Sequence, residues 1–334
     1  MTEGLLTGLK AIAEMTRLRI LFALSHGELN VSETTYILNQ SQPRVSRHLK
    51  VMSEATLITR HKEGNWVLFR LNESGVSGAL ARAIVDMLPA HELTFARDLT
   101  RIDEMRRQRN ERASRYFAAN AADWEQLRAY HVKEADVEAA MLELVGEKPV
   151  KNVVDLGTGT GRMLELFATK GETLAGLDSS REMLAIARLN IDRAGLRNAQ
   201  VRQADIYALP LPDKSADLVL FHQVMHFLDD PQRALHEARR ILHPAGRVLI
   251  VDFAPHELDE LREQHAHRRL GVSTEQMSVW LDRAGLLLHR QQVLPPPVLK
   301  SGKGLTVSLW LAGLASNDQA HTPSNQPLQL ETTS

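Results

Sequence analysis

A glycine-rich turn in the middle of the chain constrains the fold more than any other feature. An apolar run leads into Asp155, and Gly157, Gly159 and Gly161 follow at alternate positions. A strand that enters such a turn and continues as a helix lets the backbone approach a ligand closely, because glycine has no side chain to obstruct it. The pattern predicts a strand-turn-helix unit of an α/β domain, with a nucleoside cofactor over the turn.

An acidic residue downstream supports the same interpretation. Asp178 ends the next apolar run, at the distance where a carboxylate can accept hydrogen bonds from both ribose hydroxyls. A dinucleotide fingerprint would place its third glycine at the position of Arg162, so the spacing here is a different one. The D-x-G-x-G-x-G pattern resembles the first motif of class I S-adenosylmethionine-dependent methyltransferases. The alternative is a turn whose glycines serve only close packing.

The resemblance to these methyltransferases continues along the following residues. Asp205 and Ile206 come after the third apolar stretch, where the family places an acidic residue at the adenine amino group and an apolar one on the ring. Tyr116, Phe117 and Trp124 precede the sheet, where related enzymes use an aromatic lid; burial in the core is the alternative. The resemblance implies that S-adenosylmethionine or S-adenosylhomocysteine is bound by Asp155, Gly157, Thr158, Gly159, Gly161, Asp178, Ser179, Asp205, Ile206, His222 and Tyr116.

The order of the remaining elements is similar to that of the ubiquinone-biosynthesis type of methyltransferase. A buried strand at 216–221, a helix at 230–242 and a strand at 247–253 follow one another. Apolar runs at 286–294 and 305–311 supply the antiparallel edge hairpin usual in this class. We therefore expect a Rossmann-like, mostly parallel sheet with helices on both faces.

The first 75 residues carry a different pattern, which predicts a winged helix-turn-helix of the α+β class. Asn30 and Glu33 form a helix-start signal, and Pro43 fits the first turn of a later helix. Val45, Leu49 and Met52 recur at helical spacing and should face the core. A two-stranded ribbon over about residues 58–71 completes the motif.

The helix with Pro43 closely resembles the recognition helix of the ArsR/SmtB family of bacterial repressors. The resemblance covers about residues 5–90 and implies a homodimer that binds a double-stranded DNA operator. The side chains expected to face the DNA are Gln42, Arg44, Ser46, Arg47, Lys50 and Lys62. This segment is basic although the whole chain has a formal charge of only -1. A solvated basic face is the alternative reading.

We do not expect a metal ion to be the effector that this protein senses. Many members of the repressor family bind thiophilic metals through paired cysteines, whereas this chain contains no cysteine. A second family site uses carboxylate and histidine ligands; Asp86 and His91 fall in that region without the full ligand set. We therefore predict no metal and expect the effector to bind in the methyltransferase-like domain.

The chain is expected to divide into a winged helix-turn-helix at 1–92, a helical connector at 93–130, a methyltransferase-like domain at 131–315 and a disordered tail at 316–334. The connector carries an apolar stripe that includes Ile102 and Met105, followed by several arginines. The stripe either packs on the methyltransferase-like domain or pairs with its copy in a dimer, and the arginines are either a solvated face or further phosphate contacts. No apolar run is long enough to span a bilayer, so a cytoplasmic protein is expected.

Catalysis is weakly encoded because the sulfonium of the cofactor supplies the reactivity and the protein has mainly to align an acceptor. His222 and His226 are the weak candidates for a base; Asp252, His265 and His267 share the chemistry without forming a diagnostic set.

The leading hypothesis is a dimeric transcriptional regulator, a repressor by family resemblance, whose methyltransferase-like domain senses the cofactor. The alternative is an active small-molecule methyltransferase with an attached DNA-binding module. A third reading is a degenerate fold that binds no cofactor and serves as a scaffold.

Overall fold

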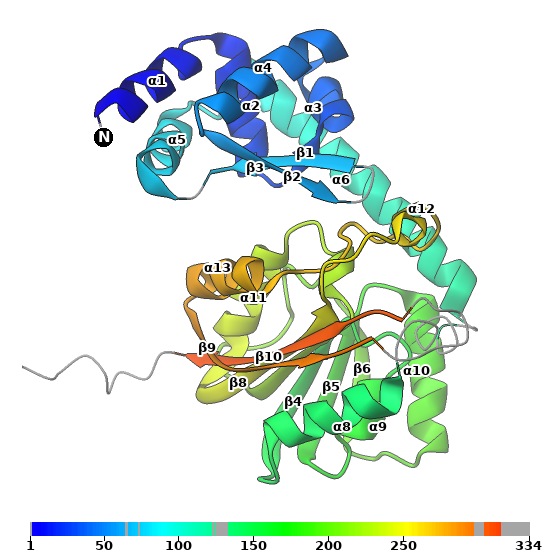
Figure 1. The fold of residues 1–334 in the computed structure, drawn as a ribbon. Helices are drawn as coiled ribbons and strands as arrows, with labels where there is room; N and C mark the ends of the chain where they lie inside the picture. Colours follow the sequence, from blue (N-terminus) through cyan, green and yellow to red (C-terminus); the bar gives the residue numbers. More distant parts are fainter. Residues whose placement is uncertain are drawn as a thin grey trace, which may run out of the picture.

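Two sheets lie in different parts of the chain (Figure 1). A three-stranded antiparallel sheet has the order β1-β3-β2, and a seven-stranded sheet has the order β6-β5-β4-β7-β8-β10-β9. The computed structural model describes residues 2–63, 66–72, 74–121, 124, 133–296 and 304–314. The predicted tail at 316–334 and the end of the predicted connector, 125–130, lie outside these residues. None of the described helices is long and apolar enough to cross a membrane.

The N-terminal domain follows the predicted helix, turn, helix and hairpin order. Asn30 Oδ1 accepts a hydrogen bond from Glu33 N at 2.9 Å, and Glu33 Oε2 accepts one from Asn30 N at 3.0 Å, which completes the expected capping box. Pro43 lies in the first turn of its helix. The elements are α1 (Thr2–Ile12), α2 (Met15–Ser25), β1 (Leu29–Asn30), α3 (Val31–Leu38), α4 (Gln42–Glu54), β2 (Ile58–Glu63), β3 (Trp66–Leu71) and α5 (Gly75–Met87).

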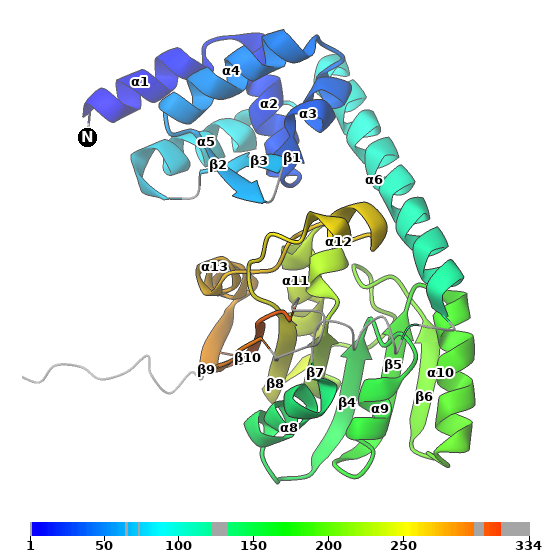
Figure 2. The same cartoon turned by 45° about the vertical axis from the view of Figure 1, so that its right-hand side comes forward.

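Helix α6 (Leu93–Asn120) corrects the interpretation of the apolar stripe. Ile102 and Met105 are buried in the same core cluster as residues of α2, α3 and α4, and the Phe95 ring lies 5.1 Å from that of Phe22. The stripe therefore packs on the helix-turn-helix domain of its own chain, which neither predicted alternative included. Figure 2 shows α6 running from this domain to the C-terminal domain, where it contacts α10 (Arg181–Arg193).

The seven-stranded sheet has the predicted mixture of directions. The strands β6, β5, β4, β7 and β8 are parallel, and β10 is antiparallel to both β8 and β9. The other elements of this domain are α8 (Glu134–Val145), β4 (Val150–Leu156), α9 (Arg162–Leu166), β5 (Gly171–Asp178), β6 (Ala199–Gln203), β7 (Ala216–His222), η2 (Met225–Phe227), α11 (Pro231–Ile241), β8 (Leu242–Phe253), α12 (Asp259–Gln264), α13 (Thr274–Ala284), β9 (Leu286–Leu294) and β10 (Val307–Leu314). Strand β8 begins earlier than predicted, and its pairing with β7 is irregular there.

Helices cover both faces of this sheet, as a mainly parallel sheet requires. Along β7, Leu218 and Leu220 pack in one core cluster with residues of α8 and α9. Val219 and Phe221 point to the opposite face and pack in a second cluster with residues of α11 and α13. Because both faces are buried, the strand reads as a continuous apolar run.

Candidate functional site

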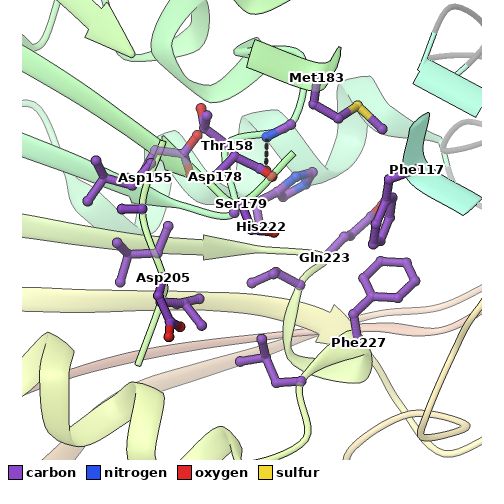
Figure 3. Close-up of a pocket in the computed structure, with 18 of the residues that line it drawn as sticks. Phe117, Asp155, Thr158, Asp178, Ser179, Met183, Asp205, His222, Gln223 and Phe227 are labelled. Carbon is purple, nitrogen blue, oxygen red and sulfur yellow. Dashed lines mark hydrogen bonds between the residues drawn. The ribbon is translucent and has the colours of Figure 1, made fainter. Parts of the chain in front are cut away.

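A cavity of about 570 Å³ opens at the carboxyl ends of β4, β5 and β7 (Figure 3). Its volume is within the range of small-molecule sites. The chain lays β5 and β6 on one side of β4 and then returns to place β7 on the other side. Ligands of open α/β sheets bind in the crevice that such a reversal leaves. The position of the cavity is therefore that of a ligand site in this class of fold.

The glycine turn after β4 contributes one wall. Gly157, Gly159 and Gly161 have φ values of 74°, 53° and 86°, a region that favours glycine. A Cβ on Gly157 would come within 2.5 Å of Val224 Cγ2, whereas one on Gly159 would meet only Trp124 Nε1, at 3.5 Å, and its Cδ1. Gly157 and Gly159 line the cavity; Gly161 does not and instead caps α9. Close packing and ligand access are thus divided among the three glycines.

Asp178 ties this turn to the end of β5. Its Oδ2 accepts a hydrogen bond from Gly159 N at 2.8 Å, and its Oδ1 accepts one from Ser180 N at 2.9 Å. Burial raises the pKa of the Asp178 carboxyl, and these backbone hydrogen bonds oppose that rise. A carboxylate offers about four acceptor sites, so it can still accept hydrogen bonds from a ligand.

Two buried polar atoms on the cavity wall fit a polar ligand. Thr158 and Gln223 are each 7% exposed, and within the described part of the chain Thr158 Oγ1 and Gln223 Nε2 have no hydrogen-bond partner. A buried polar group without a partner costs about 1–3 kcal/mol. Gln223 also has a φ of 53°, which is uncommon outside glycine. A ligand with hydroxyl, amide or carboxylate groups would satisfy both atoms.

The structure brings most of the predicted cofactor residues together. Asp155, Ser179, Asp205, Ile206 and His222 all line the cavity with the residues above. Asp205 Oδ1 accepts a hydrogen bond from Tyr207 N at 2.9 Å, and His222 is 7% exposed at the end of β7. The donors, carboxylates and apolar surface here fit a nucleoside cofactor that carries an amino-acid end.

Several lining residues were not predicted. They come from the end of β6, from the loops after β6 and β7 and from α6: Ala113, Gln203, Ala204, Tyr207, Gln223, Val224, Leu228 and Asp229. The one sequence signal that most of them share is their place at or after the end of a predicted strand. The carboxyl ends of parallel strands meet at the same edge of the sheet. Ala113 carries no such signal.

The aromatic residues divide between the cavity and a second contact. Phe117, Trp124 and Phe227 line the cavity, with ring centroids 4.9 Å apart for Phe117 and Phe227 and 5.4 Å for Phe117 and Trp124. Tyr116 is not among the lining residues, and its hydroxyl lies 2.8 Å from His265 Nδ1. Burial raises the pKa of Tyr116 to about 12, so the phenol stays protonated at neutral pH.

Three of the candidate bases, His226, Asp252 and His267, form a cluster next to Phe227. His226 Nδ1 lies 2.6 Å from Asp252 Oδ1, and both side chains are buried. The His267 ring stacks on that of His226 with centroids 4.1 Å apart. Of the predicted bases, only His222 lines the cavity itself.

Helix α4 presents the predicted DNA-facing surface. Val45, Leu49 and Met52 are almost completely buried, as expected from their spacing. The five predicted contact residues on this helix are all exposed: Gln42, Arg44, Ser46, Arg47 and Lys50. Lys62 belongs to β2, but its side chain lies outside the described part of the structure. Asp86 and His91, considered above as metal ligands, are both exposed.

Two family models match the chain. Residues 14–60 match the model described as bacterial regulatory protein, arsR family, and residues 154–250 match the model described as methyltransferase domain. A demethylmenaquinone methyltransferase of Thermus thermophilus is 35% identical over 116 residues, which are 34% of this chain and 52% of that protein. An uncharacterized methyltransferase of Bacillus subtilis, YcgJ, is 32% identical over 111 residues, 32% of this chain and 44% of that protein. The chain thus spans about half or less of these relatives.

One solved structure supports the fold of the C-terminal domain. It is described as the complex between the Haloferax volcanii Trm112 methyltransferase activator and the putative methyltransferase. The match has a TM-score of 0.51 and 24% identity, and covers 61% of this chain and 99% of that chain. The comparisons confirm the two-part fold. The methyltransferase domain supports S-adenosylmethionine as the cofactor, as the sequence predicted.

Proposed function

Because the chain joins an ArsR-type helix-turn-helix region to a class I methyltransferase domain with S-adenosylmethionine as cofactor, we propose that it is a transcriptional regulator whose DNA affinity depends on that ligand. The observation that carries this proposal is the position of α6. The helix is buried in the core of the DNA-binding domain and also lines the ligand cavity. Occupancy of the cavity and the orientation of the DNA-reading helix can therefore influence each other.

In this proposal the cavity residues hold the cofactor, and its sulfonium supplies a reactive methyl group when bound. Asp178 accepts hydrogen bonds from the ribose, while Asp205 and Ile206 bind the adenine. Gly157 and Gly159 of the turn, together with Thr158 and Gln223, receive the amino-acid end. The orphaned Thr158 hydroxyl and Gln223 amide support this assignment.

For the DNA-binding end, we propose that α4 enters the major groove as the second helix of the motif does in related folds. Three cationic side chains, Arg44, Arg47 and Lys50, project from its exposed face. Arginine and lysine contact phosphates or guanine edges, so this face supplies both affinity and sequence preference.

We further propose that the regulator is a homodimer formed through α1 and α5, two helices that pack against each other. Large apolar side chains are exposed on both: Leu5, Leu6 and Leu9 on α1, and Val76 and Met87 on α5. A second copy would bury such side chains and place two α4 helices for two half-sites. Sedimentation analysis of the protein and of a Leu6→Glu variant tests this; a monomeric wild type would refute it.

Anisotropy titration tests the main proposal. A DNA fragment selected by the protein from a random pool is titrated with no ligand, with S-adenosylmethionine and with S-adenosylhomocysteine. A ligand-dependent change in affinity, typically about 5- to 150-fold for coupled sites, is expected. Identical affinity under all three conditions would refute ligand-dependent regulation.

A second candidate function is methyl transfer to a small molecule. His222 favours it, because an imidazole on the cavity wall can act as a general base toward an acceptor bound there. The demethylmenaquinone methyltransferase among the relatives points to the same chemistry. Release of S-adenosylhomocysteine in the presence of an acceptor, lost in an Asp178→Ala variant that still binds DNA, would establish it.

A further inference from the structure

Helix α6 is a structural member of both domains. Its first half is fixed to the helix-turn-helix domain by polar contacts as well as by burial. Asp98 forms an ion pair with Arg19 of α2 at 2.6 Å. Arg101 Nη1 donates to Ile37 O at 3.1 Å, and the Tyr36 hydroxyl donates to Glu104 Oε2 at 2.9 Å. A movement of this half of α6 must therefore carry α2 and α3 with it.

The second half of α6 meets the cofactor cavity. Ala113 and Phe117 line the cavity, and Tyr116 contacts His265 in the segment after α12. From Ile102 to Phe117 the helix rises by roughly 22 Å, at about 1.5 Å per residue. One continuous element thus spans the distance between the DNA-binding core and the ligand site.

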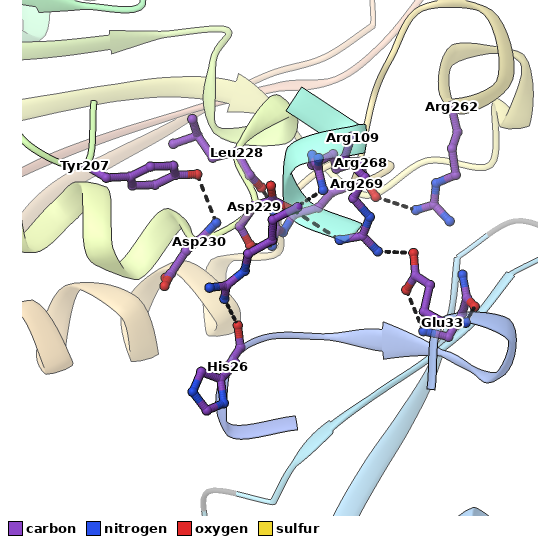
Figure 4. Close-up of polar contacts among 12 residues, drawn as sticks. His26, Glu33, Arg109, Tyr207, Leu228, Asp229, Asp230, Arg262, Arg268 and Arg269 are labelled. Atoms are coloured by element: carbon purple, nitrogen blue, oxygen red, sulfur yellow. Dashed lines mark hydrogen bonds and ion pairs between the residues drawn. The ribbon is translucent and has the colours of Figure 1, made fainter. Parts of the chain in front are cut away.

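Arg109 lies between these two halves and contacts both domains (Figure 4). Its guanidinium forms an ion pair with Glu33 of α3, and its Nη1 lies 3.2 Å from Asp229 Oδ1. Glu33 is the residue whose carboxylate completes the capping box of α3. Asp229 lies on the cavity wall, two residues beyond η2. A single side chain therefore joins the start of α3, the helix that precedes α4, to the wall of the ligand site.

The Asp229 end of this contact is shared with other cations. Arg268 also forms an ion pair with Asp229, and Arg269 donates hydrogen bonds to the backbone oxygens of Leu228 and Asp229. The Asp229 side chain is only 8% exposed and that of Arg109 only 26%. Burial lowers the pKa of Arg109, and the charge of Asp229 opposes this. Arg109 and Arg268 thus share the Asp229 carboxylate, and Arg109 has a second carboxylate in Glu33.

We infer that Arg109 is the residue that couples occupancy of the cofactor cavity to the position of the DNA-binding helices, through Asp229 on one side and Glu33 on the other. The inference rests on the proposed function, since it names the contact that transmits ligand binding. A ligand that shifts the segment of Leu228 and Asp229 changes how Asp229 is shared between Arg109 and Arg268. Arg109 then moves toward or away from Glu33 at the start of α3. Because α3 is followed by α4 after a short turn, this movement changes the position of α4.

The test compares coupling in full-length variants. Operator affinity is measured by anisotropy with and without saturating S-adenosylmethionine, and the ratio of the two affinities is the coupling factor. Arg109→Met keeps the length of the side chain but loses its charge, and should bring the factor to within about twofold of one. Cofactor affinity without DNA, measured by calorimetry, should stay within about threefold of the wild type.

Two further variants separate this role from a structural one. Glu33→Gln retains the capping box, which accepts glutamine, but loses the ion pair, so it should lower the coupling factor as Arg109→Met does. The double variant should lose no more than either single change, because both remove one contact. Arg107→Met, an exposed position on the same helix, is the matched control and should keep the wild-type factor.

The outcomes distinguish the coupling residue from the proposed function. A wild-type coupling factor of one would overturn both. If the wild type shows coupling and the Arg109→Met and Glu33→Gln variants keep the wild-type coupling factor, the role of Arg109 is overturned but the proposed function is not. Loss of cofactor binding by Arg109→Met in the absence of DNA would also overturn it, because Arg109 would then act on the ligand site itself.

Discussion

Replacing Asp98 with alanine should destabilise the helix-turn-helix domain, although Asp98 lies in a segment that the sequence suggested was a connector. Arg19 Nε lies 2.7 Å from Asp98 Oδ2 and Arg19 Nη2 lies 2.6 Å from Asp98 Oδ1, so the pair is bidentate. Asp98 is fully buried and the Arg19 side chain is only 13% exposed. Arg19 Nη2 also donates to Leu38 O at 2.9 Å, which holds the guanidinium in place.

The expected loss follows from this geometry. Removal of one partner of a buried ion pair leaves the other charge uncompensated and costs about 3–5 kcal/mol. Such a loss would lower the melting temperature of a domain of this size by roughly 12 °C or more. Urea unfolding with hydrogen exchange of the amides in α2 and α3 measures the free energy of unfolding of this domain separately.

Asp103→Ala is the matched control, because Asp103 is an exposed aspartate on the same helix. It should change the free energy of unfolding by less than about 0.5 kcal/mol. If Asp98→Ala cost less than about 1 kcal/mol, as an exposed ion pair would, the conclusion that α6 is part of the N-terminal domain would be wrong.

Three other predictions concern the two sites. Arg47→Ala should weaken specific DNA binding by about 1–3 kcal/mol if the side chain contacts a base edge. If it contacts only phosphate, the dependence of log affinity on log salt concentration should become shallower by about one. Anisotropy titrations at several salt concentrations distinguish these two outcomes. Because burial raises the pKa of Asp178, its carboxylate is protonated at a higher pH than a free aspartate, so calorimetry should find weaker cofactor binding as the pH is lowered, and Asp178→Asn should flatten this dependence. The contribution of Asp178 to the free energy of unfolding changes with pH in the opposite direction. This contribution is fully present below the pKa that Asp178 has in the unfolded chain, and it is lost as the pH rises through the higher pKa of the folded protein. Gly157→Ala should destabilise the domain more than Gly159→Ala, because only the first adds a Cβ within 2.5 Å of Val224; thermal unfolding of both variants checks this, and equal losses would contradict it.

Many residues of the cavity wall could be predicted because their sequence signals are local. The glycine turn requires positive φ at Gly157, Gly159 and Gly161, which few other residues tolerate. Asp178 and Asp205 follow predicted strands, and the carboxyl ends of parallel strands meet at one edge of the sheet. The same holds for the capping box at Asn30, whose hydrogen bonds span only three residues.

The two aromatic residues Tyr116 and Phe117 show what local sequence patterns do not determine. Tyr116 and Phe117 are neighbours on α6, and both fit the lid that the family resemblance implied. Successive residues on a helix point about 100° apart, so only one of them can face a given cavity. The rotation of α6 about its axis is set by the burial of Ile102 and Met105 in the other domain, and this rotation directs Phe117 to the cavity.

The sequence by itself determined the fold of each part, the glycine turn, the α4 surface and the acidic ends of the strands, because these depend on local backbone geometry and on hydrophobic periodicity. Only the tertiary structure decided which surface buries the stripe of α6, and which carboxylates Arg109 meets. Periodicity shows that a helix face is buried but not against what. Glu33 and Asp229 lie 196 residues apart in sequence, and only folding brings both to one guanidinium.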